Sequence, residues 1–192
     1  MIRYFLPAVL LFLTACNNAE QATDSNITPA TVKKVSFFPV TAYFKGQLID
    51  IRQKGQNPMK FVTVNNHTDS VIIKFEELDS LVKEFLTPVI DTSNLTAGYT
   101  ETKFLDQTIN AFTYTYDIKP GTDPEPMLRH WDVYVDPENG KVKRVYIIKK
   151  TADNKTLQLT WQHNQWFKTT VLAPGKDGND TIEREEKIVW DY

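Results

Sequence analysis

The second half of the sequence consists of short runs in which apolar and polar residues alternate, separated by turn-forming residues. Residues 109–117 place Phe112, Tyr114 and Tyr116 at alternate positions, with threonines between them. A period of two is the pattern of a strand with one buried face. Between two such runs, residues 136–140 combine a proline, which fixes φ, with a glycine, which permits positive φ. This half of the chain is therefore expected to form an antiparallel β-meander.

Over the whole chain, the sequence pattern predicts mainly consecutive strands and few helices. In this half, the expected strands cover residues 99–105, 109–117, 131–135, 142–148, 157–161, 166–172 and 181–190. Two more β-rich runs, 61–64 and 71–75, flank a polar loop, and apolar residues recur at helical spacing in about 36–53 and 76–87. The fold class expected is α+β, a curved antiparallel meander of about six to nine strands with two amphipathic helices packed on one face.

Charge is nearly balanced, with 22 basic and 24 acidic residues. A nucleic-acid partner is therefore not expected. Basic residues gather on one predicted hairpin and acidic residues on the last strand, where they are either binding patches or cross-strand ion pairs, and the small net charge favours pairs. The basic set is Lys141, Lys143, Arg144, Lys149, Lys150 and Lys155, and the acidic set is Glu183, Glu185 and Glu186.

The N-terminal segment has the pattern of a signal peptide. Arg3 precedes an apolar run, 4–13, which is shorter than the roughly 20 residues that a bilayer-spanning helix needs. The residues Leu13-Thr14-Ala15-Cys16 follow, and they include the only cysteine of the chain. This motif resembles the lipobox of bacterial lipoprotein precursors. The resemblance implies cleavage before Cys16, a diacylglycerol thioether on its sulfur, and an acyl group such as palmitate on the freed amine. The alternative is an ordinary secretory signal peptide with an unrelated cysteine.

The expected domain organisation follows from these patterns. Residues 1–15 form the lipoprotein signal peptide, 16–34 the lipidated cysteine and a flexible tether, and 35–192 a single globular α+β domain. Acyl chains on Cys16 would hold the protein on a membrane of the cell envelope. We expect the outer membrane, facing the periplasm, because acidic residues do not follow Cys16 directly, as they do in the surface-exported lipoproteins of Bacteroidota. The cell surface is the alternative location.

Sequence motifs of nucleotide, phosphate or zinc-protease chemistry are absent, so neither a cofactor nor a metal site is expected. His67 and His163 lie among polar residues that favour turns. His130 and Asp132 are two positions apart at a predicted strand and should share one face. They are the catalytic candidates for the alternative function, a small envelope hydrolase with an unidentified nucleophile. Residues 177–180 carry possible calcium ligands, but they match a solvated turn better.

The aromatic residues of the β-rich half are the ligand-binding candidates. They either form the core or line an apolar groove between the sheet and the helices. The candidates are Phe112, Tyr114, Tyr116, Trp131, Trp161 and Trp166. We favour a non-catalytic protein that binds an unknown envelope protein or an apolar small molecule. The layout is similar to that of lipid-carrying lipoproteins such as LolA-like half-barrels, an analogy at the level of fold.

Three short motifs resemble the Asp-Ser/Thr-apolar sequon of O-glycosylation in Bacteroidota. They place possible modification at Ser70, Ser80 and Thr181. Such short motifs also arise by chance. In layout, the whole chain resembles the uncharacterised single-domain lipoproteins that are common in Bacteroidota.

Overall fold

A computed structural model describes residues 37–91, 97–175 and 177–191. The predictions for the signal peptide, the lipidated Cys16 and the tether lie outside these residues. None of the described helices is both long and apolar enough to cross a membrane.

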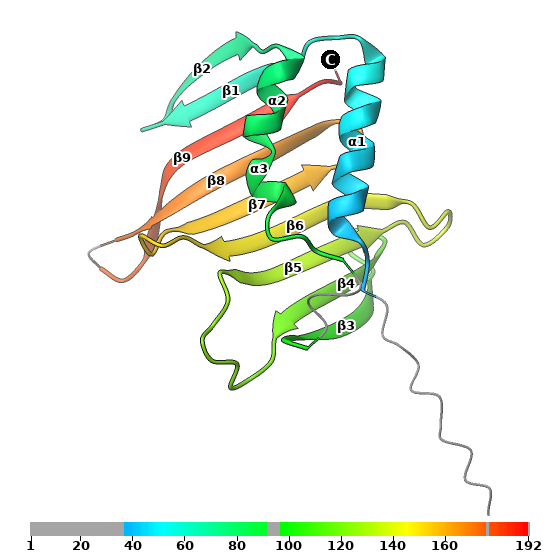
Figure 1. The fold of residues 1–192 in the computed structure, drawn as a ribbon, viewed down its shortest axis with the longest axis vertical. Coiled ribbons are helices and arrows are strands. Elements are labelled where there is room, and N and C mark those ends of the chain that lie inside the picture. Colours follow the sequence, from blue (N-terminus) through cyan, green and yellow to red (C-terminus); the bar gives the residue numbers. More distant parts are fainter. Residues whose placement is uncertain (1–36, 92–96, 176, 192) are drawn as a thin grey trace, which may run out of the picture. The chain divides into compact units, whose positions relative to one another are not determined.

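The described residues form one open antiparallel sheet of nine strands (Figure 1). From β4 to β9 each strand pairs with the one that precedes it, so the expected meander is confirmed. The hairpin of β1 and β2 joins this meander beyond β9, which leaves β2 and β3 at the two edges. The strands are β1 (Met59–Val64), β2 (His67–Ile72), β3 (Tyr99–Asp106), β4 (Ala111–Ile118), β5 (Leu128–Val135), β6 (Val142–Lys150), β7 (Thr156–Gln162), β8 (Trp166–Pro174) and β9 (Asp180–Val189).

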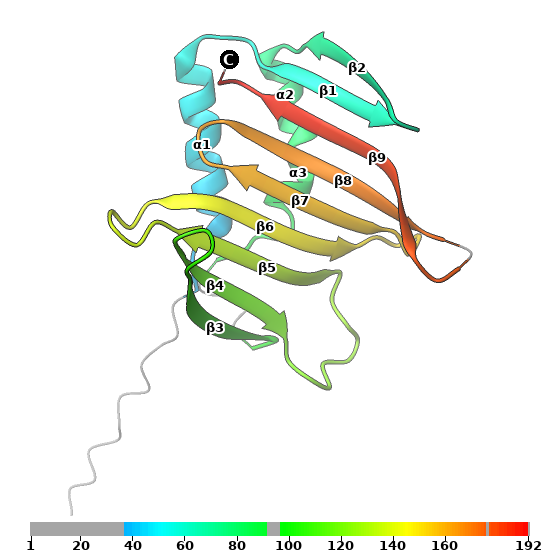
Figure 2. The same ribbon diagram turned by 180° about the vertical axis from the view of Figure 1, so that it is seen from behind.

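The helices α1 (Val40–Lys54), α2 (Phe75–Leu81) and α3 (Lys83–Leu86) all lie on one face of the sheet. The same elements appear behind the sheet in the reverse view (Figure 2), where the other face is uncovered. The domain is mostly β, so the expected α+β class with two helices holds only roughly. The second predicted helix is in fact two short ones, separated at Val82.

The first hairpin has a shorter turn than expected. The sequence predicted a loop over 65–70, but β1 and β2 are joined by Asn65 and Asn66 alone, with φ of 49° and 63°. Asparagine tolerates the left-handed region better than most residues, so two in succession support a two-residue hairpin turn. His67 consequently lies in β2, and not in a turn.

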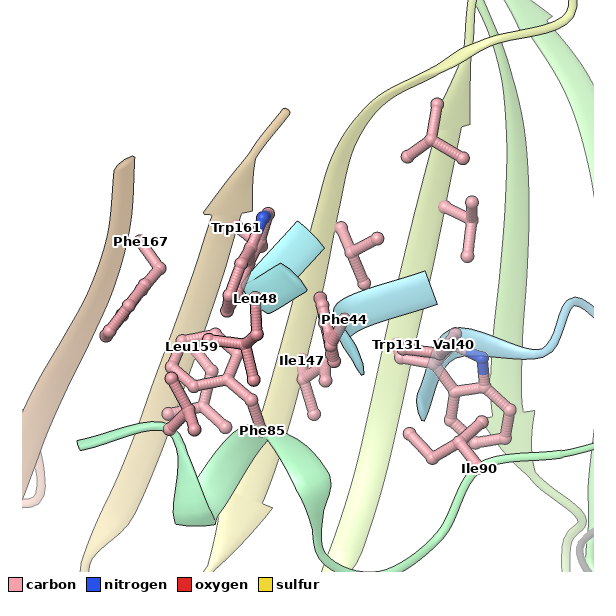
Figure 3. Close-up of a cluster of buried hydrophobic side chains, with 14 of the residues drawn as sticks. Val40, Phe44, Leu48, Phe85, Ile90, Trp131, Ile147, Leu159, Trp161 and Phe167 are labelled. Atoms are coloured by element: carbon pink, nitrogen blue, oxygen red, sulfur yellow. The ribbon is translucent and has the colours of Figure 1, made fainter. Parts of the chain in front are cut away.

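The core lies between the helices and the sheet (Figure 3). Phe44 of α1 and Phe85 of α3 pack on Trp161 of β7, with ring centroids 4.8 and 5.4 Å apart. In β5, Trp131 stacks on Tyr116 of β4 at 4.6 Å. Aromatic contacts thus join both main helical segments to the middle of the sheet.

Candidate functional site

Strand alternation gives the sheet two chemically different faces. In β5, Trp131 and Val133 face the helices and are buried in the core. Their neighbours His130, Asp132 and Tyr134 therefore face the uncovered side. The structure brings His130 and Asp132 together on that side, as their spacing predicted.

These side chains belong to a polar network that we call the histidine cluster, formed by Thr115, Asp117, His130, Asp132 and Tyr134. His130 Nδ1 lies 2.7 Å from Asp117 Oδ1, and His130 Nε2 lies 3.1 Å from Asp132 Oδ2. The hydroxyls of Thr115 and Tyr134 donate to the two oxygens of Asp132, at 2.6 and 3.1 Å. Both nitrogens of the imidazole are therefore engaged by carboxylates.

The cluster holds its histidine in the charged form. The hydrogen bond to Asp132, with a further contribution from Asp117, raises the pKa of His130 to about 9, although burial opposes the rise. Burial alone would raise the pKa of Asp132, but hydrogen bonds from His130 and Thr115 outweigh it and lower that pKa. A charged imidazole with both nitrogens bound is poorly suited to accept a proton from a nucleophile. The Thr115 hydroxyl donates to Asp132 and not to His130.

The histidine cluster should make stability depend on pH. Because the pKa of His130 is about 9 in the folded protein and about 6.5 when unfolded, its contribution is complete below about pH 6.5 and disappears as pH rises through 9. We expect the His130→Gln variant to be less stable than wild type by roughly 2 kcal/mol at pH 6, and this difference to shrink toward pH 10. Urea denaturation at both pH values measures this difference in stability. An NMR titration that gives the His130 imidazole a pKa near 6.5 would contradict the prediction.

The aromatic candidates do not line one groove. Tyr116, Trp131 and Trp161 are fully buried in the core. Phe112 and Tyr114 are half-buried on the helix side, where the Lys103 ammonium lies 4.7 and 4.8 Å from their ring centroids. Trp166 lies on the uncovered face, with the Lys187 ammonium 4.6 Å from its ring. The six candidates are thus divided among the core and both faces.

A cavity of about 700 Å³ lies where the end of α3 meets the ends of β5, β6 and β7. We call it the α3 pocket. Its exposed surface is mostly apolar. The apolar wall consists of Pro88, Tyr99, Pro126, Met127, Leu128 and Leu157. The sequence-based candidates include none of these residues, because they come from four separate segments that only the fold brings together.

Lys149 is the buried polar residue of the α3 pocket, which is also lined by Glu84, Thr87, Lys150 and Thr151. Its side chain is almost completely buried, and its ammonium donates to Glu84 Oε2 at 2.6 Å, to the Glu84 carbonyl at 2.8 Å and to the Thr87 carbonyl at 2.6 Å. The ammonium and the Glu84 carboxylate neutralise one another, whereas Lys150, which also lines the pocket, forms no ion pair among the described residues.

The charged sets identified in the sequence do not pair as a whole. Because β6 and β9 are not neighbours in the sheet, cross-strand pairs between them are impossible. Lys155, in the turn after β6, does reach Glu183, at 2.9 Å. Glu185 instead pairs with Lys168 of the adjacent strand β8, at 2.8 Å.

The remaining candidates lie at the surface. Ser70, Ser80 and Thr181 are exposed. In the turn before β9, the Asp177 carboxylate accepts hydrogen bonds from the backbone and side chain of Asn179, both at 3.1 Å. Among the described residues no group of three or more potential ligands could hold a metal ion.

Comparisons of the chain with protein-family models, curated proteins and solved structures gave no match. The open antiparallel sheet with helices on one face is an architecture, and an architecture alone does not determine a function. The function depends on the sites that the fold carries.

Proposed function

We propose that this chain is a non-catalytic, lipid-anchored protein of the cell envelope that binds an apolar small molecule in the α3 pocket. The observation that supports binding is the pocket itself, whose volume of about 700 Å³ lies in the range typical of small-molecule sites. Its exposed surface is mostly apolar, and its buried cation, Lys149, is neutralised by Glu84.

An apolar ligand explains the pocket better than the alternatives. Met127 lines it although the residue is 54% exposed, so an apolar occupant would remove apolar surface from water. A hydrolase based on His130 and Asp132 agrees less well with the geometry, because both imidazole nitrogens of His130 face carboxylates. A protein partner would need a larger apolar surface than the pocket offers.

A charge in the α3 pocket should weaken ligand binding. We expect Met127→Glu to reduce the affinity for the neutral fluorescent probe N-phenyl-1-naphthylamine by at least about tenfold, because the bound probe would desolvate the new carboxylate. Ile182→Glu is the matched control, since Ile182 is also highly exposed, at 65%, but lies outside the pocket. Fluorescence titration measures both. Equal affinity in the two variants would count against the α3 pocket as the binding site.

The lipid anchor is supported by the Leu13-Thr14-Ala15-Cys16 motif. We expect Cys16→Ser to abolish acylation, so that most of the protein moves from the membrane pellet to the soluble fraction, because two or more acyl chains are needed for stable attachment. Fractionation and intact-mass measurement test this, with Ser25→Ala as a control in the expected tether. An unmodified N-terminus in wild type would refute the anchor and leave the α3 pocket proposal unaffected. We place the anchored protein in the outer membrane, facing the periplasm.

A further inference from the structure

A second, smaller cavity of about 320 Å³ opens on the uncovered face of the sheet. It lies at the end of the sheet where the turn between β3 and β4 approaches β6 (Figure 2). We call it the bulge pocket. It is lined by Ile109, Ala111, Tyr134, Lys143, Arg144 and Gln162. The proposed apolar-ligand site shares none of these residues.

A β-bulge places two consecutive cations in this pocket. Tyr134 pairs with Arg144, but the next residue of β5, Val135, pairs with Val142, so Lys143 is an extra residue opposite the shift in register. In a regular strand, Lys143 and Arg144 would face opposite sides of the sheet. The bulge removes that alternation, and both side chains line the same cavity. Redirecting a side chain in this way is a common role of bulges at functional sites.

The two cations retain donors for a ligand. Arg144 Nε donates to Gln162 Oε1 at 3.0 Å, which fixes the guanidinium, and among the described residues its two Nη groups have no hydrogen-bond partner. Lys143 Nζ donates to the carbonyls of Ile109 and Asn110, at 3.2 and 3.3 Å, so one of its three protons remains.

The pocket is also positively charged. Its six lining residues include two cations and no acid. The Asp132 carboxylate of the histidine cluster, which does not line the pocket, is engaged by His130, Thr115 and the Tyr134 hydroxyl. Neither Lys143 nor Arg144 hydrogen-bonds a carboxylate of the described residues.

We propose that the bulge pocket binds the carboxylate of a small organic acid. The unpartnered edge of the Arg144 guanidinium matches the two oxygens of a carboxylate, and Lys143 supplies one further hydrogen bond. Ile109 and Ala111 form an apolar wall for the hydrocarbon part of the acid. The volume suits a small molecule.

Benzoate is the test ligand, with benzamide as its uncharged counterpart. In calorimetric titrations of the purified full-length protein at pH 7, benzoate should bind saturably and benzamide should not. Arg144→Gln should weaken benzoate binding by at least about tenfold, and Lys143→Gln should weaken it less. Arg184→Gln is the matched control, because Arg184 is an exposed strand arginine outside the pocket and should leave binding unchanged.

Three results would overturn the proposal. The first is no saturable benzoate binding up to about 10 mM. The second is equal weakening by Arg144→Gln and Arg184→Gln, which indicates attraction to surface charge in general. The third is tighter binding of phenyl phosphate than of benzoate, which would assign the pocket to phosphate esters. Circular dichroism and thermal unfolding verify that each variant is folded before titration.

Discussion

Replacing Trp161 with alanine is expected to lower the free energy of unfolding by about 3–5 kcal/mol. The indole is completely buried. Its ring centroid lies within 6 Å of four other aromatic rings, those of Phe44, Phe85, Phe167 and Trp190. Alanine would leave a cavity where α1, α3 and the sheet meet, and the surrounding rings cannot close it without losing their own contacts.

Two further variants show which property of Trp161 matters. The indole Nε1 is buried without a hydrogen-bond partner among the described residues, so Trp161→Phe removes volume but no hydrogen bond and should cost clearly less than alanine. Trp166→Ala, on the uncovered face, should cost no more than about 1 kcal/mol. Urea denaturation measures all three. A loss for Trp166→Ala as large as that for Trp161→Ala would contradict the assigned core.

The meander was predictable because its signals are local. Strand alternation and turn residues lie within a few positions of one another, so the hairpin across residues 136–140 could be recognised from its proline and glycine. The position of the first hairpin could not be predicted in this way. β1 pairs with β9, more than 120 positions along the chain, and no local pattern determines which edge receives it.

The histidine cluster was predictable in part for the same reason. The spacing of His130 and Asp132 gives their shared face, since alternate residues of a strand point the same way. The contact with Asp117 depends on the register between β4 and β5, in which Asp117 pairs with His130. A long proline-containing connection joins these strands, so the sequence does not determine that register.

The alternation of side chains in β6 contains two patterns that are missed when charged residues are grouped only by their position in the sequence. In β6, the buried residues Val142 and Val145 are three positions apart, whereas Val145 and Ile147 are two apart. The change of spacing indicates the bulge at Lys143. Lys149 comes two positions after Ile147 and so lies on the same, buried face of the strand, which indicates a buried cation. The adjacent Lys150 has the opposite parity and hydrogen-bonds Thr156 on the other side.

Lys149→Met is expected to lower the free energy of unfolding by about 3 kcal/mol, near the lower limit for removing one partner of a buried ion pair. The change leaves the backbone carbonyls of Glu84 and Thr87, whose hydrogen bonds to Lys149 are part-buried, without this donor, and acceptors shielded from water are costly to leave unsatisfied. The Glu84 carboxylate relieves part of the loss, because its side chain is 46% exposed and can turn toward water.

Lys150→Met provides the matched control for this variant. It removes the same charge from the neighbouring position, but the Lys150 ammonium hydrogen-bonds only the Thr156 hydroxyl among the described residues, so the loss should not exceed about 1 kcal/mol. Urea denaturation compares the two. Hydrogen exchange should also accelerate at α3 in Lys149→Met, because the ammonium joins that helix to β6. Equal stability of the two variants, with unchanged exchange at α3, would show that Lys149 does not hold the helix against the sheet.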